Sequence, residues 1–327
     1  MLTDPYVVNV SSVQDYMSCP FRWLCKWVEN RVPRAEPRAF RFGKLYHKLF
    51  EWHLGEGLSM EVAIQAAREE WIAEVRDKDP NSTEWGDALE DLNAMAEPLM
   101  LWKDQYPFDV PVLEVEQPYV FPFPGDSSIY IRMRPDRIGL RNAYLWHVQH
   151  KALAAGKDFS SFILLAHRSY HEHIYAEGIV QKYGLDSGPI TWQGHEIKGY
   201  RGTHFDLYRK LKYRRKQTLK QLQAGEPGTI LNPVQTLFWQ QPMIVDLDSP
   251  QHKHVIASLH THIINMRRTE IDYRERGIIP APNENMNGGY YGNKPDEYFY
   301  VLIGQADLSD DTKFKNREET YAAPDAA

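Results

Sequence analysis

An aspartate and a lysine stand near the two ends of the segment 134–153, RPDRIGLRNAYLWHVQHKAL. Its two halves are rich in Ile, Val, Tyr and Trp and are separated by turn residues, which predicts two neighbouring antiparallel strands over 130–140 and 144–153. Side chains two residues apart share one face of a strand, so Gln149 lies beside Lys151. Asp136, Gln149 and Lys151 are therefore expected to meet at one end of a hairpin.

These three side chains can build a site for a divalent cation. A hard cation takes oxygen ligands, which the Asp136 carboxylate and the Gln149 carbonyl supply, with water and a substrate phosphate completing the shell. Lys151 beside such a cation can orient or deprotonate a water molecule and neutralise charge that develops on a phosphate. The same spacing also fits a solvent-facing salt bridge between Asp136 and Lys151, and spacing alone leaves both open.

The segments RPDRIGL and LWHVQHKAL resemble the PD-(D/E)XK nuclease superfamily, in which Pro-Asp is followed across a hairpin by an acid, any residue and Lys. The matching residues here are Pro135, Asp136, Gln149, His150 and Lys151. Gln149 departs from the pattern, because an amide keeps one oxygen ligand but removes a full negative charge. A non-hydrolytic DNA-binding or assembly subunit is therefore the alternative to a working nuclease.

Four further motifs follow the order of the RecB-like and Cas4-like branch, which includes phage exonucleases, over about residues 11–185. They are SSVQDYMSCPFRWLCKW, GKLYHKLFEW, LEVEQPYVF and YHEHIYAEGIVQKYG. The resemblance implies metal ligands His47, Asp136 and Gln149, with Glu116 or Glu114 of the preceding strand as a further candidate. In the Gln-x-x-x-Tyr helix, His171 replaces Gln and Tyr175 is kept, and both are implied to contact DNA.

This resemblance implies an α/β fold with a restriction-endonuclease-like core, a mixed β-sheet flanked by helices. It also implies a deoxyribonuclease that uses Mg²⁺ or Mn²⁺, is exonucleolytic and acts in recombination, repair or DNA processing with partner proteins. Many relatives hold an iron-sulfur or zinc site with four cysteines. The chain has only Cys19 and Cys25, so no iron-sulfur cluster is expected. A zinc hydrolase built on His167 and His171 is a weaker alternative.

A basic run is the second candidate for contact with DNA. Residues 201–220 carry a balance of +7 within a chain of net charge −6, so the remainder carries −13. Phosphate contacts by these cations, with stacking on Tyr208 or Tyr213, suit a single strand or a frayed end. A solvated helix face is the competing interpretation. The cations proposed to contact DNA are Arg209, Lys210, Lys212, Arg214, Arg215 and Lys216.

The elements that must position these residues follow from hydrophobic period. Helical patterns cover 12–30 and the residues around His47, and a helical insertion is expected over about 55–108. Three antiparallel strands follow from about residue 110, then a helix that ends at Gly184. We expect one nuclease-like domain over 1–307 and a disordered tail over 308–327. Without an apolar run of about 20 residues or a leader pattern, the sequence predicts a cytoplasmic protein that does not contact membrane.

Overall fold

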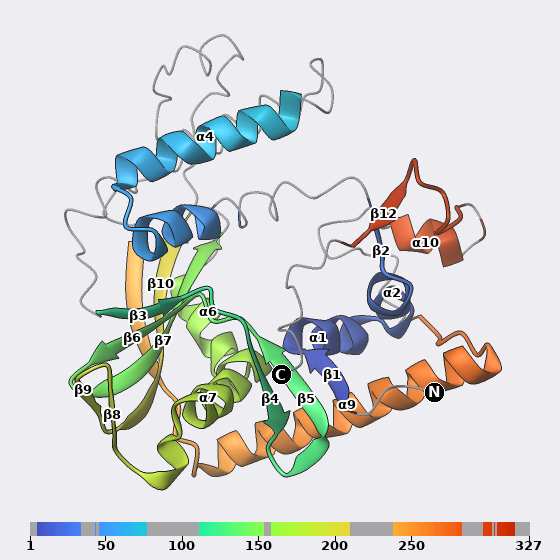
Figure 1. Ribbon diagram of the computed structural model, residues 1–327. Helices are drawn as coiled ribbons and strands as arrows, with labels where there is room; N and C mark the ends of the chain where they lie inside the picture. The colour runs from blue at the N-terminus through green and yellow to red at the C-terminus, as the bar shows by residue number, and fades with distance from the viewer. Residues whose placement is uncertain are drawn as a thin grey trace. The chain divides into compact units, whose positions relative to one another are not determined.

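The computed structural model describes residues 5–33, 43, 46–76, 111–153, 158–209, 238–282, 297–302, 304 and 306–317. Its contacts divide the chain into two compact units, each built from separate stretches (Figure 1). The first comprises Met1–Glu36, Pro118–Met133 and Asp248–Ala327, and the second comprises Pro37–Gln117 and Arg134–Leu247. The single domain expected over 1–307 stays a prediction.

A five-stranded sheet forms the centre of the second unit, with strand order β11-β10-β7-β6-β3. β7 and β10 run parallel, whereas the other neighbouring strands run antiparallel. The predicted mixed sheet of an α/β fold is therefore confirmed. Its strands are β3 (Val112–Val115), β6 (Arg137–Arg141), β7 (Tyr144–Leu153), β10 (Gly199–Arg209) and β11 (Phe238–Ile244).

Side-chain N-caps mark the starts of two helices of the second unit. The Asp158 side chain accepts from the Ser161 N–H at the start of α6 (Phe159–Ala166), and Ser169 likewise caps α7 (Tyr170–Tyr183). Gly184, in the left-handed region at φ 67°, ends α7 where the sequence predicts. Residues 46–50 are helical. The remaining elements are η2 (Glu51–Gly55), α4 (Met60–Arg76), η3 (Leu185–Ser187), β8 (Ile190–Trp192) and β9 (His195–Ile197).

The first unit holds a smaller sheet of order β1-β5-β4, in which β1 (Tyr6–Asn9) runs parallel to β5 (Asp126–Met133). The long helix α9 (Pro250–Arg276) packs on α1 (Val10–Ser18). The Tyr6 hydroxyl donates to Glu270 of α9 at 3.0 Å, which joins residues 264 apart in sequence. The other elements are α2 (Pro20–Trp23), η1 (Leu24–Val28), β2 (Arg31–Pro33), β4 (Tyr119–Phe123), α10 (Glu297–Leu302) and β12 (Phe314–Asn316).

The three strands expected from residue 110 are in fact five, and they belong to two different sheets. β3 ends before Glu116, which lies in the left-handed region at φ 50°, and β4 starts at Tyr119. β5 ends at Met133, and β6 begins only after Pro135. The prediction of continuous strands was wrong at these two breaks, because a positive φ and a proline interrupt pairing without changing hydrophobic period.

The helix expected over 12–30 is also divided. Cys19 is extended, at φ −161° and ψ 107°, because the residue before a proline avoids the helical region. Pro20 then starts α2 at the first helical position. Of the helical insertion expected over about 55–108, the structure shows α4 up to Arg76, and residues 77–110 lie outside the described part of the chain.

Two further expectations differ from the structure. The basic run starts as strand β10 up to Arg209 rather than as a helix face, and residues 210–237 are not among those described. Within the expected disordered tail, β12 pairs antiparallel with β2, and Phe314 is fully buried against Tyr298. Burial of this aromatic ring offsets the cost of ordering the segment. Among the helices described, none combines the length and apolarity needed to cross a bilayer.

Candidate metal site

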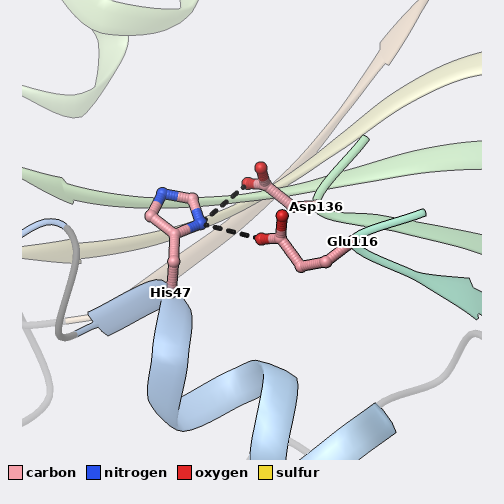
Figure 2. A group of neighbouring side chains, drawn as sticks. All are labelled: His47, Glu116 and Asp136. Atoms are coloured by element: carbon pink, nitrogen blue, oxygen red, sulfur yellow. Dashed lines mark ion pairs between the residues drawn. The ribbon is translucent and has the colours of Figure 1, made fainter. Parts of the chain in front are cut away.

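His47, Glu116 and Asp136 come together in the second unit, from the helical turn 46–50, the end of β3 and the start of β6 (Figure 2). The His47 Nδ1 atom lies 3.5 Å from Glu116 Oε1 and 3.6 Å from Asp136 Oδ2. One potential ligand atom from each residue lies within 4.8 Å of the other two. Within the described ranges, this is the only group of three such residues close enough to hold a metal ion.

Backbone N–H groups and the Arg134 side chain hold the two carboxylates in place. The Glu116 N–H donates to the Asp136 carbonyl oxygen at 3.1 Å, and the Arg134 guanidinium lies 2.8 Å from Glu116 Oε2. Asp136 Oδ2 in turn accepts from the His150 N–H at 2.9 Å. The left-handed conformation of Glu116 is costly for a residue other than glycine, so the surrounding contacts must maintain it.

In the group of His47, Glu116 and Asp136, two carboxylates face one imidazole, so negative charge predominates. Burial alone would raise the pKa of Asp136, but the positive charges of His47 and Lys151 outweigh it and hold that pKa below its usual value. Burial likewise disfavours the His47 imidazolium, yet Asp136 and Glu116 raise the pKa of His47. The site therefore stabilises positive charge at the point where the three side chains meet.

The donor atoms fit a divalent cation. Two carboxylates and one imidazole nitrogen suit a borderline-hard ion such as Mn²⁺, and two carboxylates with water suit Mg²⁺. The His47 side chain is 31% exposed, so water and a substrate phosphate can reach the group. Of the predicted metal ligands His47, Asp136 and Gln149, with Glu116 as a further candidate, the structure brings His47, Asp136 and Glu116 together, and metal binding by them stays a prediction.

Gln149 and Lys151 lie on β7, next to Asp136. β6 and β7 pair with Arg137 opposite Val148, which puts Asp136 beside Gln149. Gln149 is buried and Lys151 half-buried. The Lys151 charge affects the pKa values of Asp136 and His47, so it lies within electrostatic range of both.

His171 and Tyr175 lie on α7, with ring centroids 5.7 Å apart, and Tyr175 also contacts His147 of β7 at 5.0 Å. Burial first, and then the Lys151 charge, lower the pKa of His171 to about 4, so its ring is neutral near pH 7. Because the Lys151 charge affects the pKa of His171, the first turn of α7 lies near the β6–β7 hairpin.

Two buried acids of this unit were missed by the sequence interpretation. Glu172 of α7 accepts from Thr203 Oγ1 at 2.5 Å and lies 3.7 Å from His147 Nδ1. Asp206 of β10 lies 3.4 Å from both Arg137 and His150. A charged residue between Phe205 and Leu207 in an apolar strand was the available sign of Asp206.

Other expected sites fare differently. His167 is the C-cap residue that follows α6, whereas His171 lies in the first turn of α7, so the single helix that would hold zinc at their spacing is not formed. Cys19 and Cys25 are buried in the first unit, and they form no disulfide with each other. Arg209 is the last residue of β10. The remaining proposed DNA contacts lie outside the described residues: Lys210, Lys212, Arg214, Arg215 and Lys216.

A mixed sheet that brings an Asp and a Lys together on a hairpin, with a His from an earlier helix, is the arrangement of a metal-dependent nuclease. Residues 7–172 match the PD-(D/E)XK nuclease superfamily, and the chain belongs to it. Members of this superfamily are generally nucleases that use divalent metals. Among curated proteins, none matches this chain.

Proposed function

We propose that this protein is a metal-dependent deoxyribonuclease whose site is formed by His47, Glu116, Asp136 and Lys151. The observation that carries the proposal is the convergence of two carboxylates and an imidazole within 4.8 Å, beside the lysine of the nuclease motif. A site that had lost its chemistry would have no need for the unfavourable backbone conformation that holds Glu116 there.

Each residue has a distinct role in this proposal. His47, Glu116 and Asp136 hold the cation, with the Gln149 carbonyl as a further oxygen donor. A bound divalent cation lowers the pKa of a water molecule and neutralises charge on the phosphate. Lys151 orients the attacking water and stabilises the negative charge that develops in the transition state. His171 and Tyr175 order the DNA strand beside the hairpin.

Glu116 provides the charge that Gln149 cannot. With Asp136 it gives the site two carboxylates, the number that the motif has when its second acid is present. The imidazole of His47 favours Mn²⁺ over Mg²⁺, because nitrogen ligands suit the softer of the two ions. We therefore expect activity with both ions and a preference for Mn²⁺.

The finer features rest on resemblance. They are exonucleolytic cleavage, membership of the RecB-like and Cas4-like branch with its phage exonucleases, and a role in recombination, repair or DNA processing with partner proteins. A cytoplasmic location is likewise a prediction from the sequence.

The first test is cleavage of end-labelled DNA with Mg²⁺ or Mn²⁺ by the wild type and Lys151→Ala. Lys198→Ala is the matched control, because Lys198 is an exposed lysine of the same unit. We expect the rate to fall by at least about 100-fold in Lys151→Ala, the scale of a lost proton-transfer group, and to stay unchanged in Lys198→Ala. DNA binding by the wild type without cleavage under either metal would instead favour the assembly subunit that Gln149 suggests.

A further inference from the structure

His150 stands between Gln149 and Lys151 in β7, so its side chain points to the opposite face of the sheet. Its N–H donates to Asp136 Oδ2. Its ring stacks on Phe50, with centroids 4.0 Å apart and 3° between the planes. Phe50 follows His47 by three residues in the same helical turn. One residue thus contacts a candidate metal ligand and the helix that carries another.

The His150 ring lies beside the buried ion pair of Arg137 and Asp206. Asp206, opposite His150 in the pairing of β10 with β7, lies with its Oδ2 atom 3.4 Å from His150 Nδ1. Arg137 donates to the same oxygen at 3.4 Å, and Gln240 donates to Oδ1 at 3.0 Å. Because Arg137, His150 and Asp206 are all at most 2% exposed, the ring has little freedom to leave this position.

We propose that His150 is a positioning residue of the metal site, whose stacked ring fixes the helix of His47 relative to Asp136. The inference rests on the proposed function, because it assumes that these residues bind metal. His150 acts through its neighbours and does not itself contact the substrate. Mutation of groups that orient metal ligands typically weakens metal binding by about 10–100-fold.

The test is titration of the full chain with Mn²⁺ by calorimetry. His150→Ala removes the stack, whereas His150→Phe keeps it together with the backbone N–H. We expect His150→Ala to bind Mn²⁺ at least about tenfold more weakly and His150→Phe to stay within about threefold of the wild type. Ile263→Ala is the control for lost packing, since Ile263 is fully buried in α9 of the other unit. It should bind Mn²⁺ as the wild type does.

A second measurement needs no metal. The His47 ring signals in ¹⁵N-histidine NMR spectra, assigned with His47→Gln, should shift in His150→Ala and stay in place in His150→Phe. Wild-type affinity in His150→Ala, or equal losses in both variants, would overturn the positioning role. A wild type that binds no Mn²⁺ would instead overturn the proposed metal site, and unshifted His47 signals in His150→Ala would then overturn the positioning role separately.

Discussion

Glu116 shows how one residue can be costly for the backbone and useful for a site. Its φ of 50° turns the chain out of β3, and its carboxylate faces His47. Gln149, on the neighbouring hairpin, offers an oxygen without charge. The metal affinity of the site should therefore depend on how many carboxylates are present and less on which residue supplies them.

Gln149→Glu should strengthen Mg²⁺ binding by about tenfold, equivalent to roughly 1.4 kcal/mol, because it adds a negative charge to the site. Glu116→Gln should weaken it by a similar factor. Calorimetric titration measures both, with Glu196→Gln as the control for an exposed acid of the same unit. Unchanged affinity in Glu116→Gln would place the cation elsewhere.

The sequence predicted the residues of the candidate site better than it predicted the buried acids that surround them. Asp136 and Lys151 follow from strand parity and motif spacing, and His47 from its place in an ordered set of motifs. Asp206 and Glu172 were not predicted, because their partners lie on other strands and helices. Contacts such as Asp206 with Arg137 span 69 residues, and no local pattern records them.

The ion pair of Arg137 and Asp206 joins β6 to β10 across β7. Burial raises the pKa of Asp206 to about 6 although Arg137 opposes the shift, and burial also lowers the pKa of Arg137 to about 10. Both shifts show that desolvation of the pair is costly. The benefit of the pair is therefore that each buried charge has a counter-ion.

Asp206→Ala should destabilise the protein by about 3–5 kcal/mol, because it leaves the Arg137 guanidinium buried without its counter-ion. The double variant Arg137→Met with Asp206→Leu should recover most of that loss. Urea denaturation monitored by tryptophan fluorescence measures both. A double variant no more stable than Asp206→Ala would show that the pair is not the source of the loss.

A second pair links β5 to α9 in the first unit. The His260 ring lies 2.8 Å from Asp126 Oδ2, and this contact, followed by hydrogen bonds from Ser128, lowers the pKa of Asp126 to about 2. A lowered pKa stabilises the fold above the unfolded value of about 4, and that contribution is lost as the pH falls through about 2. Asp126→Asn should therefore flatten the decline of stability between pH 4 and pH 2.

Thermal unfolding at several pH values measures this effect. Asp248→Asn, which removes a fully exposed carboxylate, is the control and should keep the wild-type slope. A slope in Asp126→Asn equal to that of the wild type would contradict the role of the pair.

Much of the element pattern was predictable, since period and caps are local. The mixed sheet and the end of α7 at Gly184 were predicted, and both are confirmed. The division of strands between two sheets was not predicted, because a strand's neighbours depend on distant chain segments. The hydrophobic period predicted continuous elements through Cys19 and Glu116, and it was wrong there because the backbone changes direction at both residues.

Charge is distributed unevenly along the sequence, with a basic run over residues 201–220 in a chain of net charge −6. Replacing Lys210, Lys212 and Arg214 by alanine should weaken DNA binding to a similar degree for different sequences. The slope of log affinity against log salt should become shallower by about 2–3 for three lost phosphate contacts. Fluorescence anisotropy at several salt concentrations measures it, with Lys253→Ala as a control. An unchanged slope would exclude this segment from the interface.

The first unit joins the two ends of the chain, through β2 with β12, α1 with α9 and Tyr6 with Glu270. During translation, residues 5–33 emerge long before these partners exist. The residues of the second unit come between these segments in the sequence and can bury their own apolar surface earlier. The first unit must then close a long loop of chain, and the entropy cost of this step makes it slow and late in folding.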